Sequence, residues 1–395
     1  MKRIIALLCV ILFAFSLVAC GSGDPETNYN KALECLEKGE YEKAHRLLYE
    51  LGDYKDAKDY LSKFRIYYKK YTVKNYAGSA TLDFEYDSYG NLILSDEIEY
   101  IGGGGINVIE NCFSCEYEYD ASGKITKCTY PEGDVTVYIY DAEGKVEKYE
   151  IYDASGNFVK EHDYASDSST IKQERDEDGN LVKETEYDSE GNEISTTEYT
   201  YDSNKRVIKR VQRDTEGNES VETLEYNEAG RVTKYVDNAF HTTDIFVYNS
   251  ENVLTECTEY EENGALRSKH EFDDAENMTK ATYYDSDGSV KGVDEYEYDS
   301  FGKITKIIDY NSDGTVNSKE EYKYDENGNL VKEVSTIRGS TVTYIYSDFV
   351  YFYYPDGIPE VTGNNPYNYD YIFHFNLGDL PFNYYNAILS EYINK

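Results

Sequence analysis

The sequence has no tryptophan, only two methionines and only five histidines among its 395 residues. The H-E-x-x-H, G-x-S-x-G, P-loop and G-x-G-x-x-G patterns are also missing, which removes the usual signatures of zinc proteases, α/β-hydrolases and nucleotide-binding enzymes. The absence of tryptophan counts against a dedicated sugar-stacking site. The histidines are scattered over His45, His162, His241, His270 and His374. We therefore assign no catalytic residue, no cofactor and no metal ligand, and expect a protein that is not an enzyme.

Basic residues are also scarce, with 39 Lys plus Arg against 77 Asp plus Glu. The resulting net charge of −38 repels nucleic acids and anionic lipid headgroups. It favours cations, basic partners or simple solubility, and it excludes nucleic acid as a partner.

Long apolar runs are missing except at the start of the chain. Lys2 and Arg3 precede the run IIALLCVILFAFSLV, which has signal-peptide length and is too short to span a bilayer comfortably. The run ends in Leu17-Val18-Ala19-Cys20, followed by Gly21. This ending resembles the lipobox of bacterial lipoproteins. The resemblance implies cleavage after residues 1–20, acylation of the Cys20 thiol, a tether over 21–27, and anchorage to the lipid bilayer of the cell envelope, outside the cytoplasm.

Cysteines are few, and the five outside the signal and lipobox are Cys35, Cys112, Cys115, Cys128 and Cys257. An odd number argues against a full disulfide framework. A three-residue turn at 120–123 places Cys115 opposite Thr129, whereas a four-residue turn places it opposite Cys128 and allows a disulfide. We favour the three-residue turn and ordinary strand cysteines, and leave disulfides among Cys112, Cys115 and Cys128 open.

Residues 28–68 have helical periodicity. Apolar side chains recur at spacings of 3 and 4 in two segments, which end at Gly39 and Gly52, and a third helix is predicted from Tyr54 to Phe64. The phrases KGEYEKA and LGDYKDA resemble the second half of a tetratricopeptide repeat (TPR). This implies a short TPR-like unit between the anchor and the following region.

After Tyr71 the apolar period changes from 3.6 to 2, and turn signals recur every 11 to 14 residues up to about residue 340. The refrain is Tyr-Asp-x-x-Gly-x-φ, where φ is an apolar residue. Aspartate suits the first position of a type I turn, and glycine supplies the left-handed residue that closes a hairpin with a bulge. The region 69–340 is therefore predicted to be a chain of β-hairpins.

The turn geometry predicts which side chains face each other across each hairpin, because each tyrosine should lie opposite φ. The predicted pairs are Tyr86 with Leu92, Tyr119 with Ile125, Tyr140 with Val146, Tyr152 with Phe158, Tyr226 with Val232, Tyr284 with Val290, Tyr298 with Ile304, Tyr310 with Val316, and Tyr324 with Leu330. Tyr248 with Leu254 around Asn252, and Tyr201 with Val207 around Lys205, are variants. Asn tolerates the left-handed position, whereas Lys205 should be strained there. Tyr187 would face Glu193, which predicts a weaker or differently closed turn. A shift of one residue would place polar side chains opposite every tyrosine.

Phrases such as EYDSEGN and YDENGNLVKE resemble the YD repeats of RHS and teneurin-type proteins over residues 80–335. That family builds spiralling β-sheet shells that enclose a toxin or mediate contact at cell surfaces. This chain lacks the D-P-x-G-L-like ending and an appended toxin domain, so we expect a partial spiral or open sheet. The fold class expected is mainly β, a long twisted antiparallel hairpin meander after a small helical unit.

Residues 341–395 lose the refrain and are denser in aromatic residues. We interpret them as a C-terminal cap, with a short helix at NYYNAILSEYI, residues 383–393.

One stretch fits the calcium-loop expression: Asp309, Asn311, Asp313 and Gly314, followed by Glu320. Flanks that alternate with period 2 disagree with the helices of an EF-hand, and the hairpin turn already explains Asp313 and Gly314. Weak Ca²⁺ binding by clustered turn carboxylates is the surviving hypothesis.

The function predicted from these patterns is a membrane-anchored, non-enzymatic surface binding or adhesion module. Its partner would be a cell-wall glycan or a protein, and no ligand-binding residue is assigned. This function predicts several tyrosines exposed on one concave surface. The alternative is a structural spacer or accessory envelope protein, which predicts tyrosines covered by a curled sheet. A cell-wall-active hydrolase is a distant third.

Overall fold

The computed structural model describes residues 24–101, 105–142, 145–163 and 169–354. The helices are α2 (Pro25–Glu37), α3 (Tyr41–Leu51) and α4 (Ala57–Leu61). None of the helices in these ranges is long and apolar enough to cross a membrane. The strands are β1 (Phe64–Asn75), β2 (Gly78–Tyr86), β3 (Leu92–Ile101), β4 (Gly105–Ser114), β5 (Glu116–Tyr119), β6 (Ile125–Thr129), β7 (Val135–Tyr140), β8 (Val146–Tyr152), β9 (Phe158–Asp163), β10 (Thr170–Arg175), β11 (Leu181–Tyr187), β12 (Glu193–Tyr201), β13 (Val207–Asp214), β14 (Glu219–Tyr226), β15 (Val232–Asp237), β16 (Thr242–Tyr248), β17 (Leu254–Glu261), β18 (Leu266–Phe272), β19 (Met278–Tyr284), β20 (Val290–Tyr298), β21 (Ile304–Asn311), β22 (Val316–Tyr324), β23 (Leu330–Ile337) and β24 (Ser340–Tyr353).

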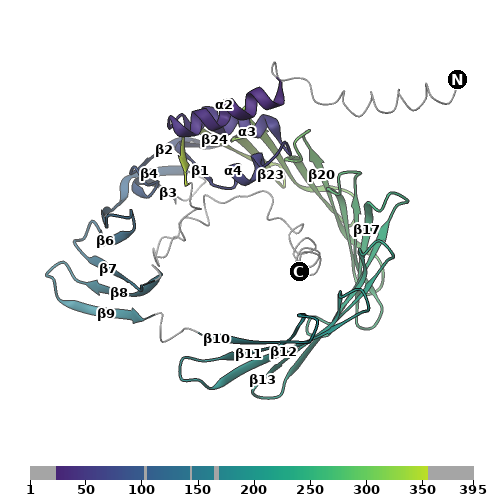
Figure 1. Cartoon of the computed structure of the whole chain (residues 1–395). Helices are drawn as coiled ribbons and strands as arrows, with labels where there is room; N and C mark the ends of the chain where they lie inside the picture. Colours follow the sequence, from purple (N-terminus) through teal and green to yellow (C-terminus); the bar gives the residue numbers. More distant parts are fainter. Residues whose placement is uncertain (1–23, 102–104, 143–144, 164–168, 355–395) are drawn as a thin grey trace.

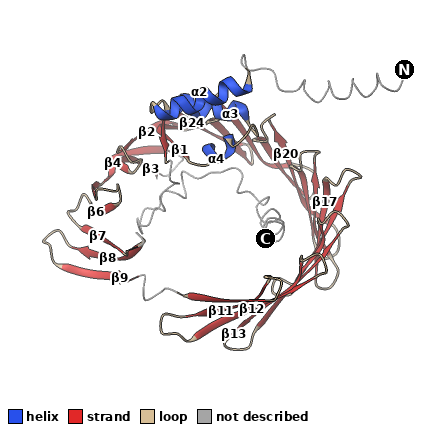
Figure 2. Cartoon of the chain, viewed as in Figure 1, coloured by secondary structure: helices blue, strands red, loops and turns tan. Residues whose placement is uncertain are grey.

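The strands form two antiparallel meanders. Strands β10 to β24 pair in sequence order, β24 pairs with β1, and β1 to β4 continue the same 19-stranded sheet. Strands β5 to β9 form a separate five-stranded sheet. Figure 1 shows the strands following one broad curve, with β5–β9 between β4 and β10, and Figure 2 shows the three helices beside β1 and β24. The fold is mainly β, as predicted, and the expected curl is present.

The predicted hairpin register is confirmed at all nine turns. Tyr298 lies opposite Ile304, for example, and the other eight tyrosines lie opposite the apolar residues assigned to them. Aromatic–aliphatic pairs of this kind contribute about 0.2–1 kcal/mol each, so together they fix the register. Immediately before each of these tyrosines the register shifts at a β-bulge.

The turns close as their sequences predict. At the β2/β3 turn, Oδ1 of Asp87 accepts hydrogen bonds from the backbone N–H groups of Tyr89 (2.8 Å) and Asn91 (2.9 Å). Gly90, with φ of 86°, donates its N–H to the Asp87 carbonyl. Only a residue without a Cβ adopts this φ at little cost. In three turns the acceptor is the third residue instead: Asn263, Asp287 and Asp313.

The variant turns test the same logic. Asn252 and Lys205 both have φ of 63°, in the left-handed position that glycine occupies elsewhere, so the predicted strain at Lys205 is present. The prediction for Tyr187 was wrong in part. Tyr187 does face Glu193, but the turn closes in the usual way, with Gly191 at φ of 84°. The local Asp–Gly chemistry therefore sets the turn without an apolar partner across it.

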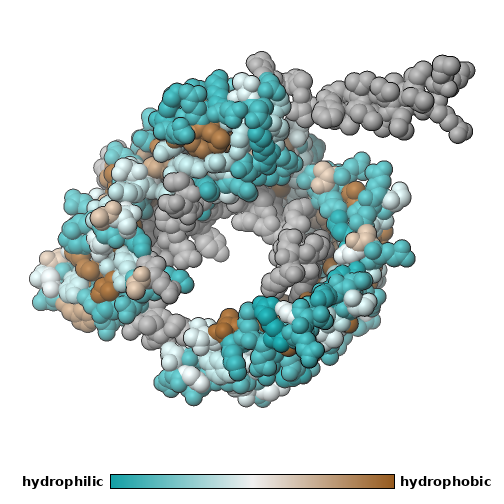
Figure 3. All heavy atoms as spheres, in the orientation of Figure 1, coloured by the Kyte–Doolittle hydropathy of each residue, from teal (hydrophilic) through white to brown (hydrophobic). Residues whose placement is uncertain are grey.

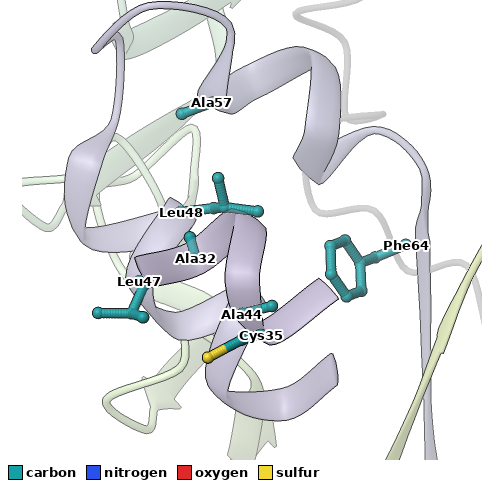
Figure 4. Packing of buried hydrophobic residues seen from close by; sticks show 7 residues of the cluster. All are labelled: Ala32, Cys35, Ala44, Leu47, Leu48, Ala57 and Phe64. Carbon is teal, nitrogen blue, oxygen red and sulfur yellow. The ribbon is translucent and has the colours of Figure 1, made fainter. Parts of the chain in front are cut away.

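The helical unit has a small core of its own. Seven buried side chains pack together there, and Figure 4 shows them: Ala32, Cys35, Ala44, Leu47, Leu48, Ala57 and Phe64. Asp24 caps α2 through a hydrogen bond from the Thr27 N–H, and Pro25 occupies the first turn. The third helix is shorter than predicted, because Phe64 already begins β1 and pairs with Tyr353 of β24.

Residues 340–353 form a strand inside the large sheet. β24 lies between β23 and β1, so this part of the predicted C-terminal cap continues the meander. The predicted helix at 383–393 and the remainder of the cap lie outside the described residues, as does Cys20.

Candidate functional site

One face of the large sheet carries most of its buried aromatic and aliphatic side chains, and we call it the tyrosine face. Two clusters lie on it, one around Leu224, Tyr235 and Phe246, and one around Tyr296 and Tyr322. Successive hairpin turns of a meander lie at opposite ends of its strands, and each of the two rows of turns forms one edge in this sense. The turns that precede β11, β13, β15, β17, β19, β21 and β23 define one edge, and the intervening turns define the other.

Tyrosine hydroxyls bond successive hairpins together along the first of these edges, which we call the bonded edge. Each hydroxyl donates to the carbonyl of the φ residue in the preceding turn on that edge. The pairs are Tyr201 with Leu181 (2.6 Å), Tyr226 with Val207 (2.6 Å), Tyr248 with Val232 (2.7 Å), Tyr298 with Met278 (2.7 Å) and Tyr324 with Ile304 (2.9 Å). Burial raises the pKa of Tyr226, Tyr248 and Tyr298 to about 12, so these hydroxyls remain donors at neutral pH.

The bonded edge has one break, at Phe272, which occupies a tyrosine position but has no hydroxyl. There Glu276 takes the left-handed turn position with φ of 62°. Its carboxylate accepts two hydrogen bonds from the Arg231 guanidinium (3.0 and 3.1 Å) and one from the Leu254 N–H (2.8 Å). A charged side chain therefore joins neighbouring hairpins where the phenol is missing. No residue pattern in the sequence indicated this contact.

The other edge is built differently, and we call its exposed apolar side chains the apolar rim: Ile194, Phe240, Val290, Val316 and Ile337. These five are between 39% and 70% exposed. In contrast, Val232, Leu254, Met278 and Ile304, which are φ residues at the bonded edge, are buried. Neighbouring hairpins on one edge are about 10 Å apart, twice the strand spacing. Val290, Val316 and Ile337 lie at three successive turns and have that spacing, whereas Ile194 and Phe240 lie two turns apart.

Acidic side chains from neighbouring strands also lie on the tyrosine face. Glu222 is directly opposite Asp237, and Asp244 is directly opposite Glu259. Three of these carboxylates are balanced by neighbours. Glu222 contacts Arg210 (2.7 Å), Glu259 contacts Arg267 (3.0 Å), and Asp237 accepts the Ala239 N–H (2.7 Å).

Asp244 is the exception in this acidic group. Its side chain is fully buried, and neither carboxylate oxygen has a hydrogen-bond partner among the described residues. Burial, with the nearby charges of Glu259 and Asp237 adding to it, raises the pKa of Asp244 to about 7. The carboxyl group is therefore partly protonated near neutral pH.

A serine–histidine contact lies beside this group. The Ser268 hydroxyl is 2.8 Å from Nε2 of His270 and donates to Glu259 (3.0 Å). Ser268 and His270 are both buried, and burial lowers the pKa of His270 to about 4. A hydrolase needs its nucleophile open to substrate, so this contact is a packing feature.

The preferred interpretation of the cysteines was wrong, because Cys115 and Cys128 form a disulfide with a Cα–Cα distance of 6.5 Å. The turn has the expected glycine, but a bulge before Tyr119 shifts the register, so Cys128 faces Tyr117 and not Glu116. Cys115 lies two residues before Tyr117, on the same face, and reaches Cys128 diagonally. The side chain of Cys112 is outside the described part of the structure, and Cys35 and Cys257 are free and buried.

The calcium-loop pattern is spread over two strands and a turn. Asp309 is on β21, Asp313 is in the turn where it accepts the Thr315 N–H (2.9 Å), and Glu320 is on β22 beside the Tyr322 hydroxyl. Over the described ranges no three His, Cys, Asp or Glu side chains are arranged to hold a metal ion. Weak Ca²⁺ binding by turn carboxylates remains a prediction.

The other histidines are separate. His45 is buried in the helical unit, where burial and the charge of Lys303 lower its pKa to about 4. His162 lies beside the Tyr149 ring (5.4 Å between centroids), and exposed His241 is 3.2 Å from Glu262. His374 lies outside the described residues. The structure therefore brings no two of the described histidines together.

Two hollows lie elsewhere on the molecule. One, of about 540 Å³, lies over β17–β21 and has walls of both charge signs, including Glu271, Lys280 and Glu297. The other, of about 560 Å³, lies between α3 and β24 and includes Tyr41 and Phe349. Both hollows are open to solvent. The face of the molecule shown in Figure 3 is mostly hydrophilic, with hydrophobic residues scattered over it.

The helical unit is fixed to the sheet next to the second hollow. Tyr49 covers the β22/β23 turn so closely that a Cβ on Gly328 would lie 2.6 Å from its ring. Lys303 stacks on the same ring (4.8 Å), and Arg46 pairs with Glu326 (3.1 Å). The helices therefore sit directly on the bonded edge and leave the apolar rim uncovered.

The nine predicted tyrosines are all half-buried, neither fully exposed nor fully covered. Their rings stabilise the hairpins, and at the bonded edge their hydroxyls are already used. No pattern in the sequence distinguishes the two edges, because both contain turns of the same refrain. The exposed side chains of the apolar rim are thus the candidate binding surface that sequence reasoning missed.

Comparison with known proteins gives one family match. The family model described as Teneurin YD-shell matches residues 140–351. No curated protein matches the chain.

Three solved structures are similar at low TM-score. The crystal structure of TcdB2-TccC3-TEV is 11% identical with a TM-score of 0.32, over 67% of this chain and 18% of that one. The Tc holotoxin pore of Photorhabdus luminescens is 13% identical with a TM-score of 0.25, over 69% and 18%. A porin-like protein from Bacteroides uniformis is 15% identical with a TM-score of 0.18, over 71% and 98%. This chain therefore spans less than a fifth of the length of the first two.

Proposed function

The chain belongs to the Teneurin YD-shell family, and from that premise we propose that it is a non-enzymatic binding or adhesion module anchored to the bacterial cell envelope. The family places it among structural shell or binding modules. The finer role rests on the apolar rim, where the φ residues Val290 and Val316 are exposed, in contrast to the buried φ residues of the bonded edge: Val232, Leu254, Met278 and Ile304.

The rim suits an extended, repetitive partner. Val290, Val316 and Ile337, repeated at about 10 Å, can contact successive units of a cell-wall glycan or an extended protein segment. An exposed apolar row also carries a cost in water, and a soluble protein seldom keeps one without a use. This is the observation that favours binding over a spacer.

Two features support an extracytoplasmic, lipid-anchored location. The sequence Leu17-Val18-Ala19-Cys20 has the lipobox pattern. The Cys115–Cys128 disulfide agrees with an oxidising compartment, because thiols in the bacterial cytoplasm are kept reduced. Replacing Cys20→Ser should abolish incorporation of a labelled fatty acid into the full chain expressed in a bacterium.

The binding proposal is tested by sedimentation of the full chain with purified bacterial cell walls. We expect the double variant Val290→Glu/Val316→Glu to lose at least about ten-fold in retained protein, since charges replace two apolar contacts. Val247→Glu is the matched control, because Val247 is 45% exposed but lies beside the bonded edge.

Retention of the wild-type chain no better than that of a charge-matched acidic protein would contradict binding to the wall. That result would favour the alternative, a structural spacer, for which the half-buried tyrosines and their bonded hydroxyls are the supporting observation. The cell-wall-active hydrolase has no such support, because the one serine–histidine contact described above is buried.

A further inference from the structure

The large sheet ends at β10, and this end strand is fully open. All six of its residues are exposed, including Ile171 at 62%. β10 pairs with β11 on one side only, while β9, its neighbour in sequence, belongs to the other sheet. An end strand presents a row of backbone N–H and C=O groups to any further strand, and proteins either protect such an edge or use it.

Pairing of β10 with a second copy of itself is restricted by symmetry. In an antiparallel ladder, directly opposed residues alternate between hydrogen-bonded and non-hydrogen-bonded pairs. A two-fold axis must therefore pass through the midpoint of one such pair, which places one residue opposite its own copy. Within β10 the central residue is then Ile171, Lys172, Gln173 or Glu174.

The charges select one of these registers. A centre at Lys172 or Glu174 places two like charges in direct opposition, which is unfavourable. A centre at Ile171 leaves the C-terminal half of the strand unpaired. A centre at Gln173 pairs residues 171–175 with one another, which is the longest pairing that these four centres allow within β10, and places Lys172 opposite Glu174 of the second copy, twice by symmetry. Lys172 and Glu174 make no ion pair with any other residue of the described chain, so both are available.

The end strand of the smaller sheet does not have this property. In β9 the sequence runs Phe158-Val159-Lys160-Glu161-His162, and it is also exposed over its first four residues. A centre at Lys160 or Glu161 opposes like charges, and a centre at Val159 leaves Glu161 and His162 outside the well-paired part. No centre in this run gives two lysine–glutamate pairs. β10 is therefore an end strand that is complementary to a second copy of itself, whereas β9 is an end strand that is only exposed.

We propose that β10 is a homodimer interface, in which two copies of the chain join their large sheets by antiparallel pairing centred on Gln173. The partner is a second copy of this chain, and the pairing is independent of the rim and of any wall ligand. Ile171 of each copy then lies beside Arg175 of the other, where the aliphatic part of the arginine covers the exposed side chain.

Self-association of the full chain in detergent, followed by sedimentation, tests the register. Lys172→Glu places Glu opposite Glu174 twice and should weaken dimerisation at least about ten-fold. The double variant Lys172→Glu/Glu174→Lys restores opposite charges with their order exchanged and should recover the wild-type dissociation constant. Lys160→Glu, the same change on β9, should leave it unchanged.

A covalent probe checks the centre of the interface. Gln173→Cys should be cross-linked to its own copy by a short bismaleimide, above the background of the wild-type chain, since directly opposed Cβ atoms are about 5 Å apart. A chain that stays monomeric at micromolar concentration overturns the proposal. So does a dimer that Lys172→Glu leaves intact, or a monomer in which β10 is covered by β9 or by a strand of another protein.

Discussion

At the scale of single residues, Asp244 has a free-energy cost of ionisation that its neighbours do not balance. Ionising a fully buried carboxyl group without a hydrogen bond is unfavourable, and the nearby charges of Asp237 and Glu259 make it more so. The low-cost state is the protonated one. The folded chain therefore retains a proton that the unfolded chain has already released.

The pH dependence of stability follows from that difference. Asp244 has a pKa of about 7 in the folded chain and about 4 when unfolded, so its contribution to the free energy of unfolding is full below pH 4 and is lost as the pH rises to 7. His45 and His270, with pKa values lowered to about 4, act in the opposite direction, because acid protonates them in the unfolded chain first.

The variant Asp244→Asn separates the pH dependence of stability that this carboxyl group causes from the pH dependence that the two histidines cause. The variant should be more stable than the wild type above pH 7, by roughly 1–4 kcal/mol, and the difference should shrink towards pH 4. Urea denaturation at pH 4.5 and pH 8 measures it. Glu228→Gln, an exposed change in the β14/β15 turn, is the control, and a difference that does not change with pH would contradict the assignment.

At the scale of elements, the repeating unit is a hairpin whose φ carbonyl is clamped, that is hydrogen-bonded, by the tyrosine hydroxyl of the next hairpin on the bonded edge. The turn chemistry and the tyrosine–aliphatic register could be predicted from the sequence, because both are local. The hydroxyl bond from Tyr298 to the Met278 carbonyl could not, because it crosses from the end of β20 to the start of β19, 20 residues earlier, and the refrain does not show where the hydroxyl points. Nor could the Arg231–Glu276 pair, which takes the place of such a bond at Phe272.

Removing one clamp should have a measurable effect. Tyr298→Phe deletes the hydroxyl and leaves the carbonyl of Met278 without this donor, which should lower the free energy of unfolding by about 1 kcal/mol. Tyr284→Phe is the matched control, because Tyr284 is also half-buried but its hydroxyl bonds to no described residue. Equal losses for the two variants, from denaturant midpoints, would show that the hydroxyl bond has no special weight.

The five-stranded sheet has a different clamp, its disulfide. A covalent bond between residues 115 and 128 closes a short loop and should stabilise the sheet by about 3 kcal/mol, mostly by restricting the unfolded chain. We expect Cys115→Ser/Cys128→Ser to melt at a lower temperature than the wild type. A reducing agent should lower the wild-type melting temperature to that of the variant and leave the variant unchanged. A reductant effect of similar size on the variant would point to another thiol.

The cysteine error shows where sequence reasoning stops. The turn at 120–123 was identified. The bulge inserts one extra residue, which shifts every pairing farther from the turn by one position, and the sequence does not show where that shift begins. The same offset is harmless for Tyr119 and Ile125, which lie between the bulge and the turn. The pairings predicted beside the turn glycines were therefore right, whereas the pairing predicted for Cys115, farther from Gly123, was not.

At the scale of the whole molecule, the meander returns to its beginning. β24 pairs with β1 along residues 64–74 and 343–353, and the helical unit covers the join through Phe64 and Tyr353. Local patterns predict strands and hairpins but contain nothing about this pairing, since the partners are separated by nearly the whole described chain. The sequence also leaves open the break between β9 and β10, where two consecutive strands enter different sheets.

The pairing of β1 with β24 makes the joining of these two strands a slow step of folding. β1 lacks a hydrogen-bonded neighbour on one side until β24 is in place, and contacts between residues so far apart in the sequence form slowly. A chain truncated before residue 340 would keep that flank of β1 open to water and to proteases. Protection of β1 from proteolysis during refolding therefore reports that β24 has arrived beside it.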